Sequence, residues 1–76
     1  KNMEKIKIGI KTDFITFSNL MKYAGVLQTG GQAIELIEAG LVTLNKQPIT
    51  EKRKKVYPGD CVVIKGQYEI IVETEE

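Results

Sequence analysis

Residues 29–45 have the sequence TGGQAIELIEAGLVTLN, and this stretch decides the fold. Its apolar positions recur at the spacing of one helix face: Ala33, Leu36, Ile37 and Gly40, widened by Ile34 and Leu41. Thr29 and Gln32 have the Thr-x-x-Gln spacing of a capping box, which predicts the helix start. Gly40 stands where a helix favours a left-handed residue at its end. The stretch therefore predicts a helix that runs to Gly40, and then a strand over residues 42–45.

Apolar periodicity predicts one more helix, which comes earlier in the chain and is therefore the first of the two, and three further strands. Residues 5–11 alternate lysines with isoleucines at period two, as a half-buried strand does. A helix over residues 16–24 follows, with Thr16 as its cap, Gly25 as its end and one apolar stripe: Phe17, Leu20, Met21 and Ala24. Residues 61–65 and 68–73 predict an antiparallel pair. These elements predict an α+β fold in which a two-helix hairpin packs on a small, twisted, mixed sheet.

Turn-forming residues separate the strands. Gly66 and Gln67 predict a two-residue turn with glycine at its first central position. Two further turns are expected at Lys46-Gln47-Pro48 and Pro58-Gly59-Asp60. Between them lies the charged segment 51–55, EKRKK.

Length and composition exclude several classes of protein. The 76 residues are 42% hydrophobic and 28% charged, which predicts one folded domain, spanning residues 1–76, with a small core. No apolar run reaches the ~20 residues that cross a bilayer, and no signal peptide is recognisable, so we expect a cytoplasmic protein without membrane contact. Lys1 and Asn2 precede Met3 and receive no function.

Catalysis has little support in the sequence. The chain has no histidine, no Cys-x-x-Cys motif, no phosphate-binding loop and no carboxylates at a metal-ligand spacing. Its single cysteine, Cys61, lies in an apolar stretch that predicts a buried, reduced thiol. Asp60 is interpreted as a turn residue. We therefore expect no enzyme activity, no cofactor and no metal.

The net charge of +1 conceals a segregation of signs along the chain. Residues 1–11 hold four lysines and one glutamate, and residues 42–65 hold six basic and two acidic side chains. Residues 12–41 carry one lysine against three acidic side chains, and residues 66–76 carry only acidic ones. Such a dipolar surface attracts phosphate. The alternative is that residues 52–55, called the basic segment from here on, form a solvated loop that only aids solubility.

Two groups of residues are candidates for contact with a polyanion. The first is the glycine-rich start of the second helix, where free backbone N–H groups bind anions: Gln28, Thr29, Gly30, Gly31 and Gln32. The alternative is that the glycines only permit a sharp chain entry. The second group is a polar and basic rim: Lys22, Asn45, Lys46, Gln47, Arg53, Lys54 and Lys55. Aromatic residues near this rim are few, with Tyr57 the one candidate for base stacking, which favours recognition of structured RNA through its backbone.

The order of these motifs resembles the small RNA-binding domain named after ribosomal protein S4, over residues 15–71. The carriers are the segments Leu20-Met21-Lys22, TGGQA at 29–33, IEAGLVTLN at 37–45 and KKVYPGD at 54–60. Among family members the chain is most similar to the short stand-alone YaaA-like subgroup. The resemblance implies two helices on a small sheet, with RNA contacted by the start of the second helix and by the following strand and loop. It also implies a bacterial protein that binds ribosomal RNA or a ribosome assembly intermediate.

The chain departs from this family pattern at two positions. Ile34 replaces a basic residue that many relatives have in the second helix, and Lys46 follows Asn45 where many have glycine. We therefore expect contact mainly through residues 28–32, Lys46 and residues 53–55. The partners expected are RNA, ribosomal RNA in particular, and ribosomal proteins as further candidates, with the protein acting as a monomer.

A small protein-interaction adaptor with a β-grasp-like sheet is the alternative function, since a sheet edge can pair with a partner. A ubiquitin-like sulfur carrier would need a C-terminal Gly-Gly, whereas this sequence ends in Glu-Thr-Glu-Glu. Salt dependence separates RNA binding from apolar protein contact.

Overall fold

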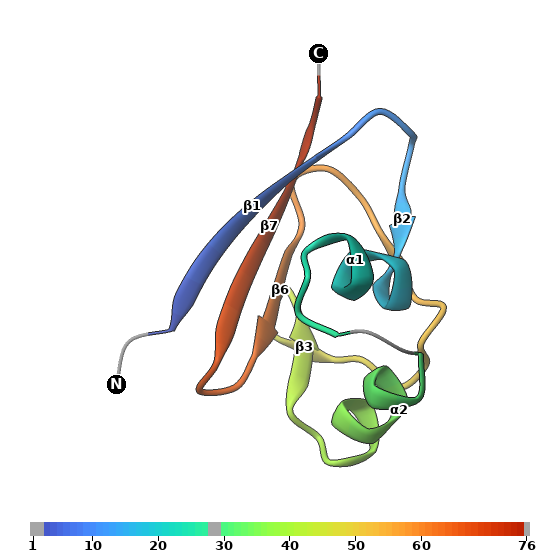
Figure 1. The fold of residues 1–76 in the computed structure, drawn as a ribbon, viewed down its shortest axis with the longest axis vertical. Helices are drawn as coiled ribbons and strands as arrows, with labels where there is room; N and C mark the ends of the chain where they lie inside the picture. Colours follow the sequence, from blue (N-terminus) through green and yellow to red (C-terminus); the bar gives the residue numbers. More distant parts are fainter. Residues whose placement is uncertain (1–2, 28–29, 76) are drawn as a thin grey trace.

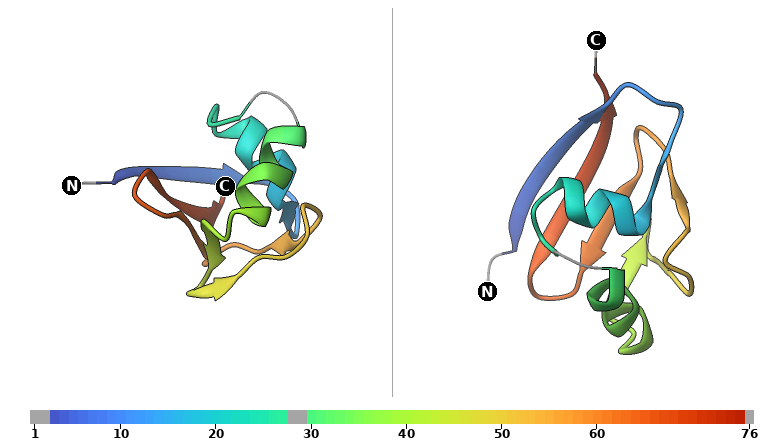
Figure 2. Two further views of the ribbon diagram at one scale, coloured as in Figure 1. Left: turned by 90° about the horizontal axis from the view of Figure 1, so that it is seen from below. Right: turned by 45° about the vertical axis from the view of Figure 1, so that its right-hand side comes forward.

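The computed structural model describes residues 3–27 and 30–75 of the chain. Within these residues the element order is β1 (Glu4–Ile10), β2 (Ile15–Thr16), α1 (Phe17–Tyr23), α2 (Gly30–Glu38), β3 (Val42–Leu44), β4 (Gln47–Pro48), β5 (Lys55–Val56), β6 (Cys61–Ile64) and β7 (Tyr68–Thr74). Figure 1 shows this arrangement, and the further views of Figure 2 show both helices on the same side of the sheet. The α+β fold class, a helix pair on a mixed sheet, is thereby confirmed.

The main sheet has the strand order β1-β7-β6-β3-β4. Strands β6 and β7 pair antiparallel as expected, with Val62 opposite Ile70. The first strand pairs parallel with the last, and Ile8 lies opposite Val72. A separate two-stranded ladder joins β2 to β5, which places Ile15 opposite Val56. This short ladder connects the chain before α1 to the chain after the basic segment.

One hydrophobic core lies between the helices and the covered face of the sheet. Phe17, Leu20 and Met21, from the predicted stripe of α1, are fully buried. From the strands the core receives alternate residues, as period-two patterning requires: Ile8, Ile10, Val42, Val62, Ile64, Ile70 and Val72. Burial of one such aliphatic side chain stabilises the fold by about 1.5–3 kcal/mol. The core therefore fixes α1 firmly on the sheet.

Both helices end as their glycines predict. Gly25 has a φ of +76° and Gly40 a φ of +73°, which is the left-handed conformation. After Gly40, the N–H of Leu41 donates to the carbonyl oxygen of Leu36 at 3.2 Å, and the N–H of Gly40 donates to Ile37 at 3.0 Å. This pair of bonds is the Schellman motif, and it closes α2 at the expected residue.

Three details of the helix predictions need correction. Ile34 does not widen the buried face of α2, because 38% of the residue is exposed. Gly40 is exposed as well, so it serves the helix end rather than the buried face. Thr16 occupies the cap position of α1 but donates or accepts no side-chain capping bond. The expected capping box of α2 involves Thr29 and lies outside the described residues.

The turns also differ from expectation in length and place. Ile64 pairs with Tyr68, so three residues connect β6 to β7, and Gly66, with a φ of +76°, is the second central residue of the turn closed by Gln67. Leu44 pairs with Gln47, so Asn45 and Lys46 alone form the preceding turn while Gln47 and Pro48 form β4. Both outcomes follow from strand register, which local turn preferences do not fix.

Candidate nucleic-acid interface

The basic segment is held against the start of α1 by its backbone. The N–H of Phe17 donates to the carbonyl oxygen of Lys54 at 2.8 Å, and the N–H of Ser18 donates to Lys52 at 3.0 Å. These bonds satisfy two of the N–H groups that the first turn of a helix leaves open, which is why Thr16 needs no side-chain cap. The segment is therefore a fixed part of the fold rather than a loose solvated loop.

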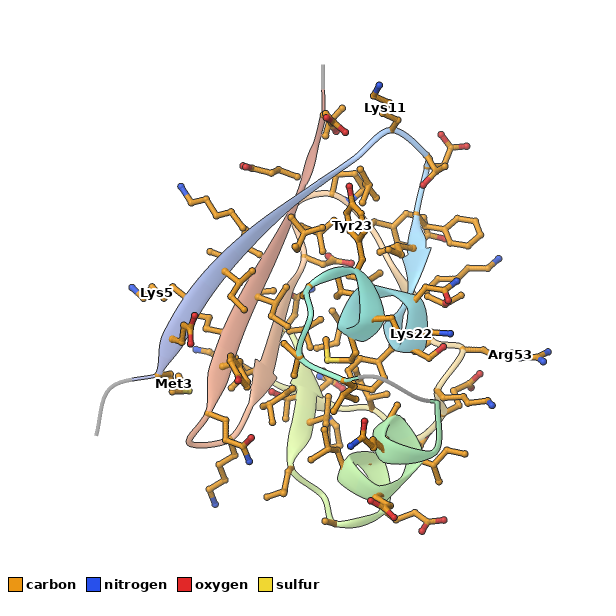
Figure 3. The ribbon with its side chains drawn as sticks, in the orientation of Figure 1. Met3, Lys5, Lys11, Lys22, Tyr23 and Arg53 are labelled. Carbon is orange, nitrogen blue, oxygen red and sulfur yellow. The ribbon has the colours of Figure 1, made fainter. Side chains whose placement is uncertain are left out.

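The side chains of this segment remain available to a partner. Arg53, Lys54 and Lys55 are exposed, and Lys22 is exposed on the last turn of α1. Figure 3 shows Lys22 and Arg53 projecting to the same side of the molecule. Within residues 3–27 and 30–75, no carboxylate forms an ion pair with any of these four cations. We call Lys22, Arg53, Lys54 and Lys55 the α1 basic surface.

The other part of the predicted rim lies in the β3–β4 turn. Asn45 has a φ of +51° and Lys46 a φ of +73°. The Asn45 amide donates to the Asp60 carboxylate at 3.0 Å, and its carbonyl oxygen accepts from the N–H of Cys61 at 3.0 Å. Asn45 therefore fastens the turn to the start of β6. We call Asn45, Lys46 and Gln47 the hairpin surface.

The hairpin surface borders the sheet face that the helices leave open. Lys46 and Asn45 line a hollow of about 340 Å³ together with Cys61, Val63 and Glu69. Val63 and Glu69 pair across β6 and β7, whereas their neighbours Val62 and Ile70 point into the core. The predicted rim is thus divided between two parts of the structure. Lys46 and Gln47 have exposed side chains there.

Only part of the predicted site at α2 can be located. Gln28 and Thr29 lie outside the described residues, and α2 begins at Gly30. Gly31 and Gln32 are exposed in its first turn, which contains no acidic residue. A first turn of this kind is compatible with an anion at the helix start.

Sequence reasoning missed one aromatic contact beside the basic segment. Phe14 and Tyr57 are in tilted contact, with ring centroids 5.8 Å apart and ring planes 51° from parallel, and the Lys55 ammonium lies 4.8 Å from the centre of the Phe14 ring. The register of β2 and β5 explains the contact, because it places residue 14 opposite residue 57. Tyr57 therefore has a packing role, and the cation–π contact holds Lys55 near the ladder.

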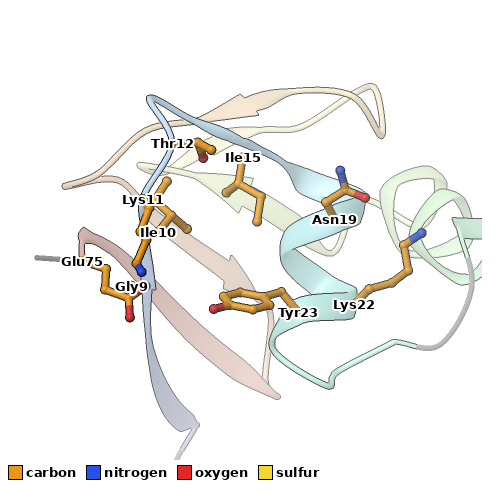
Figure 4. Close-up of a pocket in the computed structure, with 9 residues that line it drawn as sticks. All are labelled: Gly9, Ile10, Lys11, Thr12, Ile15, Asn19, Lys22, Tyr23 and Glu75. Atoms are coloured by element: carbon orange, nitrogen blue, oxygen red, sulfur yellow. The ribbon is translucent and has the colours of Figure 1, made fainter.

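A second missed feature is the groove between α1 and the end of β1. It has a volume of about 720 Å³ and is lined in part by Asn19, Lys22 and Tyr23. Figure 4 shows the Tyr23 ring pointing from α1 across the groove. The sequence feature that could have indicated this groove was the pair Asn19 and Tyr23, which lie four residues apart and so on one face of the helix.

Cys61 differs from its prediction in burial. Its thiol is free and half-buried on the open sheet face rather than fully buried. Burial raises the pKa of the Cys61 thiol, and the Glu69 carboxylate that accepts its hydrogen bond at 3.5 Å raises that pKa further. A thiol with a raised pKa is a poor nucleophile at neutral pH.

No helix in residues 3–27 or 30–75 is long and apolar enough to cross a membrane. The same residues contain no cluster of three or more side chains that could hold a metal ion.

The structure places this chain in the class of small α+β binding domains, because a helix pair packs on a mixed sheet and a basic surface lies exposed beside α1. The family model described as "S4 domain" matches residues 8–72, and the chain belongs to this family. The chain is also similar to the "Probable ribosome maturation protein RlbA" of Bacillus subtilis (strain 168). The two are 37% identical over 59 residues, which are 78% of this chain and 83% of that protein.

Proposed function

We propose that the protein is a non-enzymatic RNA-binding protein that binds structured ribosomal RNA or a ribosome assembly intermediate. The α1 basic surface is the principal contact in this proposal. Residues 28–32 at the start of α2 and Lys46 in the hairpin surface are additional contacts. The protein acts as a monomer in the cytoplasm, with ribosomal proteins as further partners.

One observation carries the proposal. The carbonyl groups of Lys52 and Lys54 bond the backbone of the basic segment to α1, while four cations nearby stay exposed and without an ion pair in the described part of the chain. Fixing the backbone reduces the entropy that the segment loses on binding. Arg53 supplies a planar fork suited to phosphate, and the lysines supply charge.

The similarity to RlbA directs the choice of RNA. That relative is named as a probable ribosome maturation protein. An S4-family chain that is 37% identical to it, and that spans most of its length, is best tested first on ribosomal RNA. The poverty of aromatic residues on the α1 basic surface favours recognition of a folded RNA through its backbone.

The test replaces Arg53, Lys54 and Lys55 together by alanine. Because their side chains are exposed and the anchoring bonds come from backbone carbonyls, the variant should keep its melting temperature. Affinity for labelled bacterial ribosomal RNA at low salt should fall by at least ~10-fold, and the slope of log affinity against log salt should decrease by about 2 to 3.

A charge-matched control replaces Lys5, Lys7 and Lys65, which are exposed on β1 and on the β6–β7 turn. It removes the same charge from other parts of the surface and should bind RNA much more tightly than the first variant. Equal losses in the two variants would reduce the effect to net charge and refute the proposed surface. Unchanged RNA binding in both variants would also refute the proposed surface.

A further inference from the structure

The groove beside α1 has the dimensions and lining of a small-ligand site. Its volume of about 720 Å³ is largely open to solvent and leaves room for a small organic group. Ile10, which is buried, and Ile15, which is half-buried, supply apolar surface. The Tyr23 residue is 62% exposed, and its ring extends from α1 across the groove towards β1 (Figure 4).

Polar groups with different chemistry stand at the two ends of this groove. Asn19 and Lys22 lie at the end formed by α1, and Lys11 and Glu75 lie at the opposite end (Figure 4). Within the described residues, no hydrogen bond or ion pair occupies the Asn19 amide, the Tyr23 hydroxyl or the Lys22 ammonium. The Asn19 amide both donates and accepts, as the hydrogen-bonding edge of a base requires. The exposed Tyr23 ring suits the face of a base, and the Lys22 ammonium suits a phosphate.

We propose that this groove holds one unpaired nucleotide of the bound RNA. The base stacks on the Tyr23 ring, its hydrogen-bonding edge meets the Asn19 amide, and a neighbouring phosphate lies against Lys22. The inference rests on the proposed function, because Lys22 belongs to both the groove and the α1 basic surface.

Tyr23 is a better stacking residue than the other exposed tyrosine. Tyr57 already packs on Phe14, and Lys55 covers the Phe14 ring. No ring contact engages Tyr23 in the described part of the chain. Bases splayed from loops and bulges are the parts of a folded RNA that stack on protein side chains. The groove thus supplies the base contact that the basic surface itself lacks.

The test compares Tyr23→Ala with Tyr23→Phe in binding to labelled bacterial ribosomal RNA. Loss of the ring should lower affinity by about 5- to 100-fold, whereas Tyr23→Phe should bind within about twofold of the parent chain because it keeps the stacking face. Gln67→Ala, at an exposed residue of the β6–β7 turn outside the groove and the α1 basic surface, is the control and should also bind within about twofold. Ultraviolet cross-linking to the same RNA, followed by trypsin and nuclease digestion, should give a nucleotide adduct at Tyr23.

The outcomes separate this inference from the proposed function. If Tyr23→Ala binds like the parent chain while the Arg53, Lys54 and Lys55 variant loses binding, the groove is refuted and the basic surface stands. Equal losses in Tyr23→Ala and Gln67→Ala also refute a specific role for the groove. A parent chain that binds no ribosomal RNA refutes both.

Discussion

The α1 basic surface and the hairpin surface present cations in opposite ways. On the α1 basic surface the backbone makes the fixing hydrogen bonds, through the carbonyl oxygens of Lys52 and Lys54, and the four cations form no ion pair within the described residues, although Lys55 contacts the Phe14 ring. On the hairpin surface the Asn45 side chain adds bonds to Asp60 and to the N–H of Cys61 beside the backbone bond from the Asn45 N–H to the carbonyl oxygen of Cys61 at 2.9 Å. Lys46 there adopts a φ of +73° that L-residues disfavour. The comparison teaches that charged side chains stay exposed and unpaired where backbone bonds hold the segment, whereas a polar side chain that makes internal bonds is less available to a partner.

The largest expected effect comes from the core beneath the α1 basic surface. Leu20→Ala removes a fully buried side chain and should lower the free energy of unfolding by about 2 to 5 kcal/mol, measured by urea denaturation. RNA binding should be lost where the variant unfolds, since the basic segment takes its position from α1. Ile34→Ala, at an exposed helix position, is the control and should change stability by less than about 0.5 kcal/mol. Equal effects would contradict the core assignment.

The next effect concerns the side-chain bonds of the hairpin surface. Asn45→Ala removes the bonds to Asp60 and to the N–H of Cys61, and it places alanine in a left-handed conformation. The expected cost is about 1 to 2 kcal/mol in urea denaturation. Gln47→Ala, an exposed amide two residues along the same hairpin, should cost much less. A harmless Asn45→Ala would mean that the hairpin is not held by its side chain.

A smaller and opposite effect is expected at Lys46. The Asn45–Lys46 turn has positive φ at both residues, the geometry in which Asn-Gly is preferred. Lys46→Gly should therefore raise the free energy of unfolding by about 0.5 to 1 kcal/mol, whereas Lys46→Ala should not. Both variants lose the same cation, so any phosphate contact by Lys46 should lower the salt slope of RNA binding equally in the two. A Lys46→Ala variant as stable as Lys46→Gly would contradict the backbone argument.

The smallest effect is a pH dependence at Cys61 on the open sheet face. The pKa of the Cys61 thiol is raised above the ordinary value of 9.0 in the folded protein. The contribution of the neutral thiol to the free energy of unfolding is therefore fully present below pH 9.0 and declines as pH rises through the folded pKa. Alkylation by iodoacetamide should accelerate with pH at a midpoint above that of a free cysteine. Cys61→Ser should remove the decline in stability at high pH. A midpoint at or below 9.0 would contradict the role of burial and Glu69.

Periodic segments of this chain could be predicted from the sequence, whereas contacts set by distant pairing could not. The stripe of α1, the left-handed Gly40 and the antiparallel β6–β7 pair follow from local patterns. The ladder of β2 and β5 is only two residues long, which is too short to show an alternation of apolar and polar residues. Neither the Phe14–Tyr57 ring contact nor the backbone cap of α1 was therefore predicted.

The site was predictable as a set of residue types but not as an arrangement. The start of α1 and the segment that carries residues 53–55 lie together because β2 and β5 pair. Asn45 forms internal bonds because Asp60 and Cys61 come close to it in the fold. The RNA contacts of all these residues stay predictions.

The central claim is tested most directly by recovering partners of the tagged protein from bacterial lysate at low and moderate salt, with and without nuclease. The account predicts that ribosomal RNA segments are retained at low salt, and that they are lost at moderate salt, after nuclease treatment and in the Arg53, Lys54 and Lys55 variant. Retention of protein partners alone, resistant to nuclease and unchanged in that variant, would contradict RNA binding and favour the adaptor alternative.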